Sequence, residues 1–477
     1  MEAVSPSAEA TGRFVRVVRP LPDGDPSTFL RWADGEARGF WGRGERWVAW
    51  AGAAAVLGGG PRGDVGRAGA PNRFGHVREE ARDLLGGTVE GWRERAPRDR
   101  PRIFGGFSFL DQGPDDPVWT GFPRARFVLP RLALERRVDG FYLAGHGPAG
   151  EQGDLEGELD RLAQLLIARS GAGQGNGAGA AGPDRVELNG GDVPGDRERW
   201  NLAVGRILAA VHDGRVEKAV LARTRDVAPS WATDTVAALA WLRRENARAH
   251  VFLFEPEPGK ILLGAAPEIL AEYRDGRFEA TAVAGSIGRG SDPEEDRALA
   301  AALLASAKDR IEHRLTVEEI TEVLSGRLSA LDVDPKPRVL TLARIQHLET
   351  RIRGRGSESE DVLSLVEALH PTPAVCGRPK ARALELIRES EPFDRGWYAG
   401  PVGWFDPAGD GDFVPALRSA VGDGRRWRLF AGAGIVEGSD PALEWAETAL
   451  KFEPALRALR AGAPGAGRDG DGAGVLE

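Results

Sequence analysis

Three charged side chains near the carboxyl end of the chain are spaced to act together. Glu444, Glu447 and Lys451, in the segment LEWAETALK, lie three and four residues apart, so a helix would place them on one face. The alternative without a function is a solvent-exposed helix face on which a glutamate and a lysine four residues apart form an ion pair. The preceding segment AGAGIV favours a site, because Gly432 and Gly434 let the backbone approach a ligand closely. This pattern predicts two carboxylates and an ammonium beside a bound molecule.

A further acid, Glu312, lies in SAKDRIEHRLTVEE on a predicted helix. Alone it would be one surface glutamate among many. Together with the acids of the last helix it offers carboxylates from two separate elements, and the chain carries no histidine or cysteine cluster to compete with them. An oxygen-only set of this kind suits Mg²⁺, which takes few protein ligands and keeps several waters. We therefore expect a magnesium site between two helices.

A buried lysine and a desolvated glutamate would supply a base and an acid. Lys218 in VEKAVLAR precedes an apolar run on a predicted strand, and burial there would lower its pKa enough for the amine to act as a base. The plain interpretation is a strand-edge lysine whose ammonium reaches water. Glu268 in LLGAAPEIL follows a proline at a strand end, where a carboxyl group can stay protonated and act as a general acid. The plain interpretation is an acid in the first turn of a helix.

Three further features could bind or shape a substrate. Arg418 ends FVPALR, and a guanidinium is the usual two-pronged partner of a carboxylate, with a surface ion pair as the ordinary alternative. The segment HPTPAVCGRPK (370–380) predicts a rigid turn that leads into a helix, or simply a connection. His347 in IQHLET is by itself more typical of a structural residue than of a ligand.

The composition limits the class of protein. Of the 477 residues, 42% are hydrophobic and 28% charged, so the chain is not disordered as a whole. The net charge of −9 argues against nonspecific binding to nucleic acid. A single cysteine, Cys376, excludes a disulfide framework and a cysteine-based zinc site. No apolar run is long enough to span a membrane and the amino terminus has no signal-like segment, so we expect a cytoplasmic protein without membrane contact.

Two glycine-rich segments divide the chain. We predict a strand-rich amino-terminal part over residues 1–169, a flexible linker over 170–183, a carboxyl-terminal region over 184–461 and a disordered tail over 462–477. In the carboxyl-terminal region the pattern predicts helices over 199–212 and from residue 441, a long helical stretch over 292–331 with a break near Gly326, and strands over 216–223, 278–285 and 427–436. Strands and helices without regular βαβ alternation favour an α+β fold.

Ten segments in this order resemble the chorismate-utilising enzymes, the family of isochorismate synthase, salicylate synthase, anthranilate synthase component I and aminodeoxychorismate synthase. They are KAVLAR, FLFEP, LLGAAPEIL, AVAGS, ASAKDRIEH, IQHL, LHPTPAVCGRPK, EPFDRGWYAGPVGW, ALRSA and FAGAGIVEGSDPALEWAETALK. The resemblance is dense from about residue 200 to 460 and thinner before the linker. It implies one two-lobed α+β fold, with two packed β-sheets and helices outside. It also implies that 184–461 is the catalytic, chorismate-binding region and that the enzyme requires Mg²⁺.

The resemblance also assigns roles to the matching residues. It implies that Glu312 and Glu447 bind Mg²⁺ directly, with Glu444 contacting the ion through water. It implies that Lys218 is the base and Glu268 the acid. The positions implied to contact the substrate are Gly285, Ser286, His347, Ala374, Tyr398, Arg418, Gly432, Gly434 and Lys451.

The choice within the family depends on the nucleophile. Family members that add ammonia lack the lysine at position 218 and pair with a glutaminase, and their turn carries a threonine-type residue where this chain has PTPAVCG. A lysine base indicates water as the nucleophile, and the HPTPA turn resembles that of isochorismate synthases. We therefore expect an isomerase that converts chorismate to isochorismate for a menaquinone, siderophore or salicylate pathway, without a glutaminase subunit. The alternatives are a salicylate synthase and a chorismate-binding relative without activity.

Overall fold

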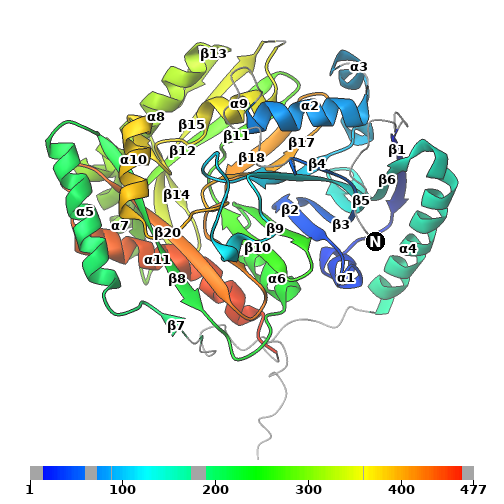
Figure 1. The fold of residues 1–477 in the computed structure, drawn as a ribbon, viewed down its shortest axis with the longest axis horizontal. Helices are drawn as coiled ribbons and strands as arrows, with labels where there is room; N and C mark the ends of the chain where they lie inside the picture. The colour runs from blue at the N-terminus through cyan, green and yellow to red at the C-terminus, as the bar shows by residue number, and fades with distance from the viewer. Residues whose placement is uncertain are drawn as a thin grey trace, which may run out of the picture.

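Antiparallel strands from both halves of the chain form the framework of the protein. The computed structural model describes residues 14–59, 72–86, 89–172, 188, 190–357 and 359–464. Within these residues 20 strands join into one hydrogen-bonded network. The network has two sheets that share the long strand β5 (Ala125–Arg137), whose first residues pair with both β3 (Arg46–Leu57) and β4 (Ile103–Phe107) (Figure 1).

The first sheet begins at β1 and ends at β8. Its strands, in the order of their pairing, are β1 (Phe14–Leu21), β6 (Gly140–Pro148), β5, β3, β2 (Arg38–Arg43), β9 (His250–Glu257), β10 (Lys260–Ala266), β19 (Ser419–Gly422), β20 (Trp427–Ile435) and β8 (Lys218–Val227), with the short strands β7 (Gly190–Gly191) and β16 (Gly377–Arg378) on β8.

The second sheet leaves β5 in the other direction. Its strands are β5, β4, β17 (Pro401–Phe405), β18 (Gly411–Pro415), β11 (Ala271–Arg274), β12 (Arg277–Gly288) and β15 (Ile345–Gly356), which also pairs with β13 (Leu328–Val333) and β14 (Arg338–Thr341). Because β2 pairs with β9 and β4 with β17, the amino-terminal strands are part of both sheets.

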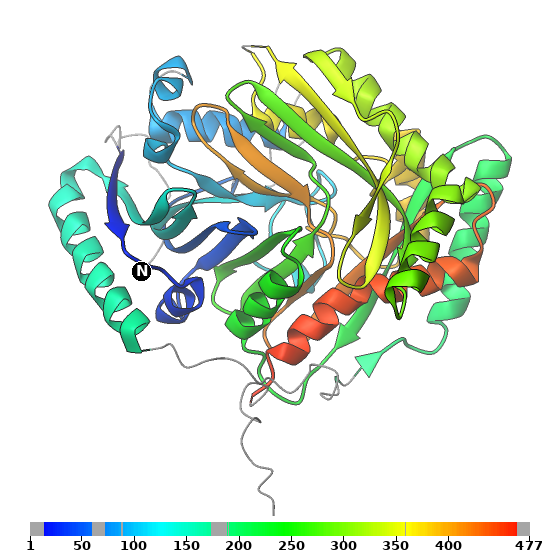
Figure 2. The ribbon, with the colours of Figure 1, turned by 180° about the vertical axis from the view of Figure 1, so that it is seen from behind.

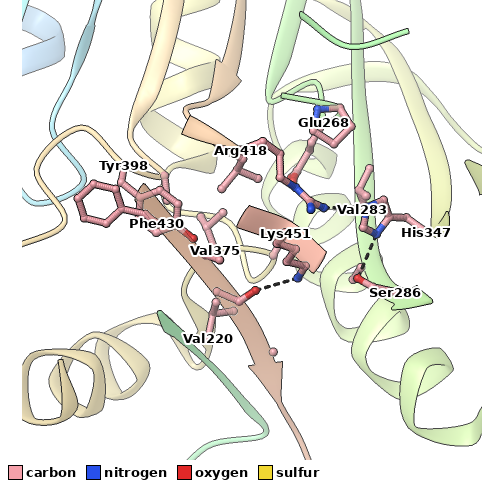
Figure 3. Close-up of a pocket in the computed structure, with 18 of the residues that line it drawn as sticks. Val220, Glu268, Val283, Ser286, His347, Val375, Tyr398, Arg418, Phe430 and Lys451 are labelled. Atoms are coloured by element: carbon pink, nitrogen blue, oxygen red, sulfur yellow. Dashed lines mark hydrogen bonds between the residues drawn. The ribbon is translucent and has the colours of Figure 1, made fainter. Parts of the chain in front are cut away.

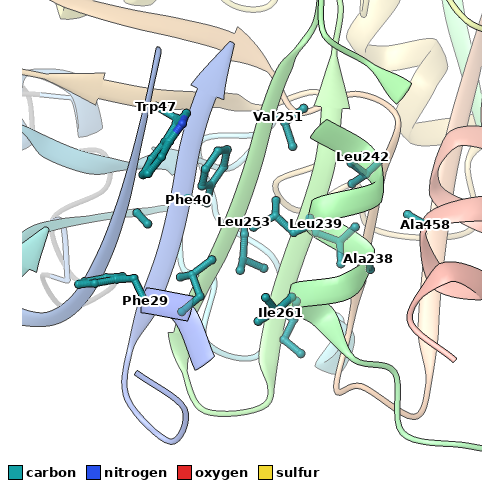
Figure 4. Close-up of a cluster of buried hydrophobic side chains, with 14 of the residues drawn as sticks. Phe29, Phe40, Trp47, Ala238, Leu239, Leu242, Val251, Leu253, Ile261 and Ala458 are labelled. Carbon is teal, nitrogen blue, oxygen red and sulfur yellow. The ribbon is translucent and has the colours of Figure 1, made fainter. Parts of the chain in front are cut away.

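Three apolar clusters explain why the sheets pack with helices outside. One lies between the sheets and contains Trp50, Phe104, Phe252 and Trp397. On the outer face of the first sheet, a second cluster packs helices α1 (Pro26–Trp32), α6 (Thr235–Glu245) and α11 (Pro441–Ala461) (Figure 4). Helix α4 (Gln152–Ala172) also contributes to this cluster. On the outer face of the second sheet, the third packs α2 (Arg73–Leu85), α8 (Ala307–Ser325) and α9 (Val362–Leu369). The remaining helices are α3 (Val89–Arg93), α5 (Asp196–His212), α7 (Pro293–Ala305) and α10 (Lys380–Ser390).

The predicted α+β class, with two packed sheets and helices outside, is confirmed. Figure 2 shows α11 and α8 close together on the side of the molecule that carries β12 and β20. The predicted linker (170–183) overlaps the end of α4 and otherwise lies outside the described residues, as does most of the predicted tail (462–477). In the described part of the chain, no helix combines the length and apolar character needed to cross a bilayer.

One predicted helix is wrong in a way that matters for the site. The pattern over 292–331 predicted a long helical stretch with a break near Gly326, but the structure has α7, an earlier break at Ser306, α8, which ends at Ser325, and then β13. The Ser306 side chain accepts a hydrogen bond from the backbone N–H of Asp309 at 3.2 Å and so starts a new helix. Because α8 begins there, its first two turns carry Lys308 and Glu312 toward the end of β20.

Candidate active site

One cavity collects most of the predicted site residues. Its volume is about 650 Å³, open mouth included, and it lies where β8, β12, β15 and β20 meet α8 and α11. The predicted residues that line it are Glu268, Gly285, Ser286, Glu312, His347, Ala374, Tyr398, Arg418, Gly432, Gly434 and Lys451. Figure 3 shows Glu268, Arg418, His347 and Ser286 along one side, with Lys451 facing them. Lys218 and Glu447 contact the lining residues Glu312 and Lys451, respectively, and Glu444 pairs with Lys308, which also contacts Glu312.

Lys218 is fully buried at the start of β8, so the interpretation of a strand-edge lysine that reaches water is wrong. Its Nζ donates a hydrogen bond to Thr316 Oγ1 at 3.3 Å and lies 3.2 Å from Glu312 Oε1. Burial lowers the pKa of Lys218 below its ordinary value, although the negative charge of Glu312 opposes the shift. The amine can therefore lose its proton more easily than a surface lysine can.

Glu268 lies in the link between β10 and β11, not in the first turn of a helix. The backbone N–H of Ile269 donates to Thr281 Oγ1 at 2.8 Å, which fixes this link against β12. Burial raises the pKa of Glu268 to about 8, against the opposing charges of Lys218 and Lys451. Its Oε1 atom is buried and has no hydrogen-bond partner in the described residues. A protonated carboxyl group at the cavity wall is thus available as a proton donor.

Three glutamates from two helices approach one another beside the cavity, and we call them the carboxylate cluster: Glu312 on α8, and Glu444 and Glu447 on α11. Burial alone would raise the pKa of Glu312, but the nearby ammonium groups of Lys218, Lys308 and Lys451 outweigh it and hold the value at about 2. Burial raises the pKa of Glu444 to about 7.

The donor chemistry of the carboxylate cluster fits a hard divalent cation. All of its ligand atoms are carboxylate oxygens, and Glu444 Oε2 is buried without a hydrogen-bond donor from the described residues. A bound cation would relieve both that unpartnered oxygen and the repulsion between the acids. The cluster is not closed around an ion, since the described residues hold no group of three Asp, Glu, His or Cys side chains in position to bind a metal. The ammonium of Lys308 lies between Glu312 and Glu444 instead.

A chain of hydrogen bonds orients the guanidinium of Arg418. Arg418 NH2 donates to His347 Nε2 at 2.8 Å. An arginine can only donate, so Nε2 accepts and the proton of the neutral imidazole lies on Nδ1. Nδ1 is 3.1 Å from both Gly285 O and Ser286 Oγ (Figure 3). Burial, followed by the charge of Arg418, lowers the pKa of His347 well below its ordinary value, so the ring stays neutral.

A second nitrogen of this guanidinium has no hydrogen-bond partner among the described residues. Arg418 NH1 is buried and unpartnered within the described part of the chain. The backbone of Arg418 has a φ of 52°. This left-handed conformation costs residues other than glycine about 1–3 kcal/mol. A fixed, unpaired donor at the cavity wall supports the prediction that Arg418 binds a carboxylate.

The two glycines of β20 leave room for, or bind, side chains of the site, a role that the sequence pattern did not predict. A Cβ atom on Gly434 would lie 2.0 Å from Glu312 Oε1 and 2.9 Å from Lys218 Cε. Gly434 is thus needed because two functional side chains pack on its backbone. Gly432 offers its carbonyl oxygen to Lys451 Nζ at 2.8 Å, and the same ammonium lies 2.6 Å from Glu447 Oε1. Lys451 therefore joins α11 to β20.

Ala374 lies in a turn that a buried arginine holds in place. Arg395 donates to the carbonyl oxygens of Val375 at 2.7 Å and Val220 at 2.8 Å, and it pairs with Glu391. Sequence reasoning missed Arg395, which lines the cavity, and Lys308. Lys308 could have been found by its spacing, since it lies four residues before Glu312 on one helix face. Tyr398 packs its ring on Phe430, with the centroids 4.9 Å apart.

Comparisons with known proteins show the family of the chain. Residues 2–460 match the family described as chorismate binding enzymes, so the chain belongs to this family and the resemblance is confirmed. The salicylate biosynthesis isochorismate synthase of Pseudomonas aeruginosa is 39% identical over 365 residues, which are 76% of this chain and 75% of that protein.

Solved structures show the same fold. The menaquinone-specific isochorismate synthase MenF from Escherichia coli matches with a TM-score of 0.73 and 26% identity, and the match covers 94% of each chain. Anthranilate synthase component I from Streptococcus pneumoniae matches with a TM-score of 0.65 and 20% identity, over 96% of this chain and 94% of that one. At that identity, the second likeness concerns the fold alone.

Proposed function

We propose that the protein is an isochorismate synthase, a magnesium-dependent isomerase that acts on chorismate in the cytoplasm without a glutaminase subunit. The observation that carries the proposal is a lysine beside the cavity, Lys218, and an acid in its wall, Glu268, whose pKa values are moved in opposite directions. Such a pair can supply a base and an acid at the same pH. The names of the similar proteins from Pseudomonas aeruginosa and Escherichia coli support the same activity.

In the proposed reaction a water molecule replaces the hydroxyl group of chorismate. Lys218 Nζ accepts a proton from water as the water oxygen forms a bond to C2. The ring double bonds shift, the bond between C4 and its oxygen breaks, and the Glu268 carboxyl gives its proton to the departing hydroxyl, which leaves as water. One water enters and one leaves, so the reaction is an isomerisation. A proton then passes from the Lys218 ammonium to Glu268 through solvent.

The other residues of the cavity would bind the substrate. Arg418 NH1, held in place through His347, would donate to the enolpyruvyl carboxylate, together with the Gly432–Gly434 backbone. In this proposal Glu312 and Glu447 would hold Mg²⁺ and Glu444 would contact it through water. The ion would neutralise the ring carboxylate of chorismate. The small apolar side chain of Ala374 leaves room for water and offers no hydrogen bond to orient ammonia.

A time course of products tests the proposal. Purified protein with chorismate and Mg²⁺, and without an ammonia donor, should accumulate isochorismate in a mixture with chorismate, followed by chromatography near neutral pH. Salicylate and pyruvate that rise together from the first minutes, with only transient isochorismate, would show a salicylate synthase instead. No change in chorismate would show a binding protein without activity.

Glu447→Gln is expected to raise the Mg²⁺ concentration for half-maximal activity at least roughly tenfold, because an amide oxygen can coordinate but carries no charge. High magnesium should restore part of the activity. The measurement is a titration of initial rate against Mg²⁺ at saturating chorismate. Glu453→Gln is the matched control, since Glu453 lies on the same helix six residues further along and pairs with Arg457. Equal half-saturation in the wild type and in Glu447→Gln would remove Glu447 from the metal site.

A further inference from the structure

Lys308 has no part in the proposed chemistry, yet it lies at the centre of the carboxylate cluster. Its Nζ is 2.9 Å from Glu444 Oε1 and 3.4 Å from Glu312 Oε2, so one ammonium joins α8 to α11. It is also 3.8 Å from Asp309 Oδ1. The side chain is 22% exposed, whereas those of Glu312 and Glu444 are 7% and 3% exposed. The lysine therefore has a path to solvent that the two acids lack.

A lysine in the first turn of a helix is electrostatically unfavourable, and the nearby acids compensate for this at Lys308. Lys308 is the second residue of α8, where the helix macrodipole repels a positive charge. Burial lowers its pKa, but Glu312, Glu447 and Glu444 together reverse this and raise the pKa well above its ordinary value. The three carboxylates thus stabilise the ammonium, and the ammonium in turn reduces the repulsion among them.

A lysine ammonium and a magnesium ion compete for the carboxylates of Glu312 and Glu444. Mg²⁺ binds carboxylate oxygens at roughly 2.0–2.1 Å, well inside the distances that Lys308 Nζ keeps from Glu444 and Glu312. Two cations in that space would also repel each other. Repulsion between the two cations therefore favours departure of the ammonium when Mg²⁺ binds between Glu312 and Glu444, and the partial exposure of Lys308 allows it to leave.

We propose that Lys308 is an internal cation of the carboxylate cluster, which holds Glu312 and Glu444 together in the metal-free enzyme and is displaced when a divalent cation binds. Lys308 is a positioning residue and touches neither substrate nor reacting atoms. This inference depends on the proposed function in one respect, namely that the divalent cation is Mg²⁺. Its tests use no chorismate, so their outcome is independent of which product the enzyme makes.

The first test compares Lys308→Met with Arg310→Met. Arg310 is an exposed residue of the same helical turn with the same charge, so its variant controls for net charge and for the macrodipole. Calorimetric titration of the metal-free proteins with MgCl₂ should show binding roughly tenfold tighter in Lys308→Met, since a charge-assisted hydrogen bond no longer has to break, and an unchanged dissociation constant in Arg310→Met.

Thermal unfolding of the same proteins gives a second readout. Without metal, Lys308→Met should melt at a lower temperature than the wild type, because the carboxylates lose their counter-charge, and Mg²⁺ should raise its melting temperature more than that of the wild type. If Lys308 were only a surface lysine at a helix amino terminus, its removal would leave the melting temperature unchanged or raise it. Equal or weaker Mg²⁺ binding in Lys308→Met would overturn the proposal.

The wild-type protein provides a test that does not depend on a folded variant. An amine-reactive anhydride, followed by mass spectrometry, should label Lys308 slowly without metal and faster after Mg²⁺ is added, while the labelling of the exposed Lys336 should not change. Labelling of Lys308 that stays constant or slows with Mg²⁺ would show that the ammonium stays in place.

Discussion

Lys218→Met is expected to lower kcat by roughly 10²–10⁴-fold, the usual contribution of a general base. Methionine fills a similar volume on β8 but cannot accept a proton from water. Because Lys218 is fully buried and pairs with Glu312, the substitution also removes a counter-charge, and its effect on binding must be measured separately. Initial rates and chorismate binding, both with saturating Mg²⁺, distinguish the two effects.

The expected result for Lys218→Met is a large loss in kcat with chorismate binding largely retained. Lys336→Met, which removes an exposed lysine, is the control and should behave as the wild type. If Lys218→Met keeps more than about a hundredth of the wild-type kcat, Lys218 is not the general base. Loss of both binding and activity would instead assign Lys218 a structural role through Glu312.

Glu268→Gln is expected to lower kcat by a similar factor, roughly 10²–10⁴-fold, because glutamine has no proton to give to the departing hydroxyl. The amide is close in shape to the protonated carboxyl group, so folding should be preserved. Glu272→Gln, four residues further along on β11, is the matched control. Activity near the wild-type level in Glu268→Gln would require another acid.

The pH profile tests the role of Glu268 more closely. Since the acid works only when protonated and its pKa is about 8, kcat/KM of the wild type should fall as the pH rises through about 8. Whatever activity remains in Glu268→Gln should lack this alkaline limb. An unchanged limb in the variant would assign it to another group.

The free energy of unfolding should also depend on the protonation of Glu268. The folded protein keeps the Glu268 proton up to a pH of about 8, whereas the unfolded chain releases it near the ordinary value of 4.5. The folded state therefore binds more protons between these values, and its free energy of unfolding should decrease as the pH rises through that range. The decrease should be smaller in Glu268→Gln.

The sequence by itself determined the family, the α+β class and the residue types available for chemistry. Ten ordered segments sufficed for the family, and hydrophobic periodicity sufficed for α5, β8, β12, β20 and α11. The spacing of Glu444, Glu447 and Lys451 placed them on one helix because that relation is local. Local rules failed at Ser306, where a side-chain cap starts a new helix inside a continuous helical pattern.

The tertiary structure decided the state of each functional group. Lys218 is buried because β20 and α8 cover it, and Glu268 keeps a proton because burial disfavours its charged form. The Nδ1–H tautomer of His347 follows from Arg418, which lies 71 residues away in the chain. Burial, charge and hydrogen-bond partners depend on residues distant in sequence, and a pKa depends on all three. For the same reason Lys308 became recognisable as a partner of Glu444 only when α8 and α11 were seen side by side.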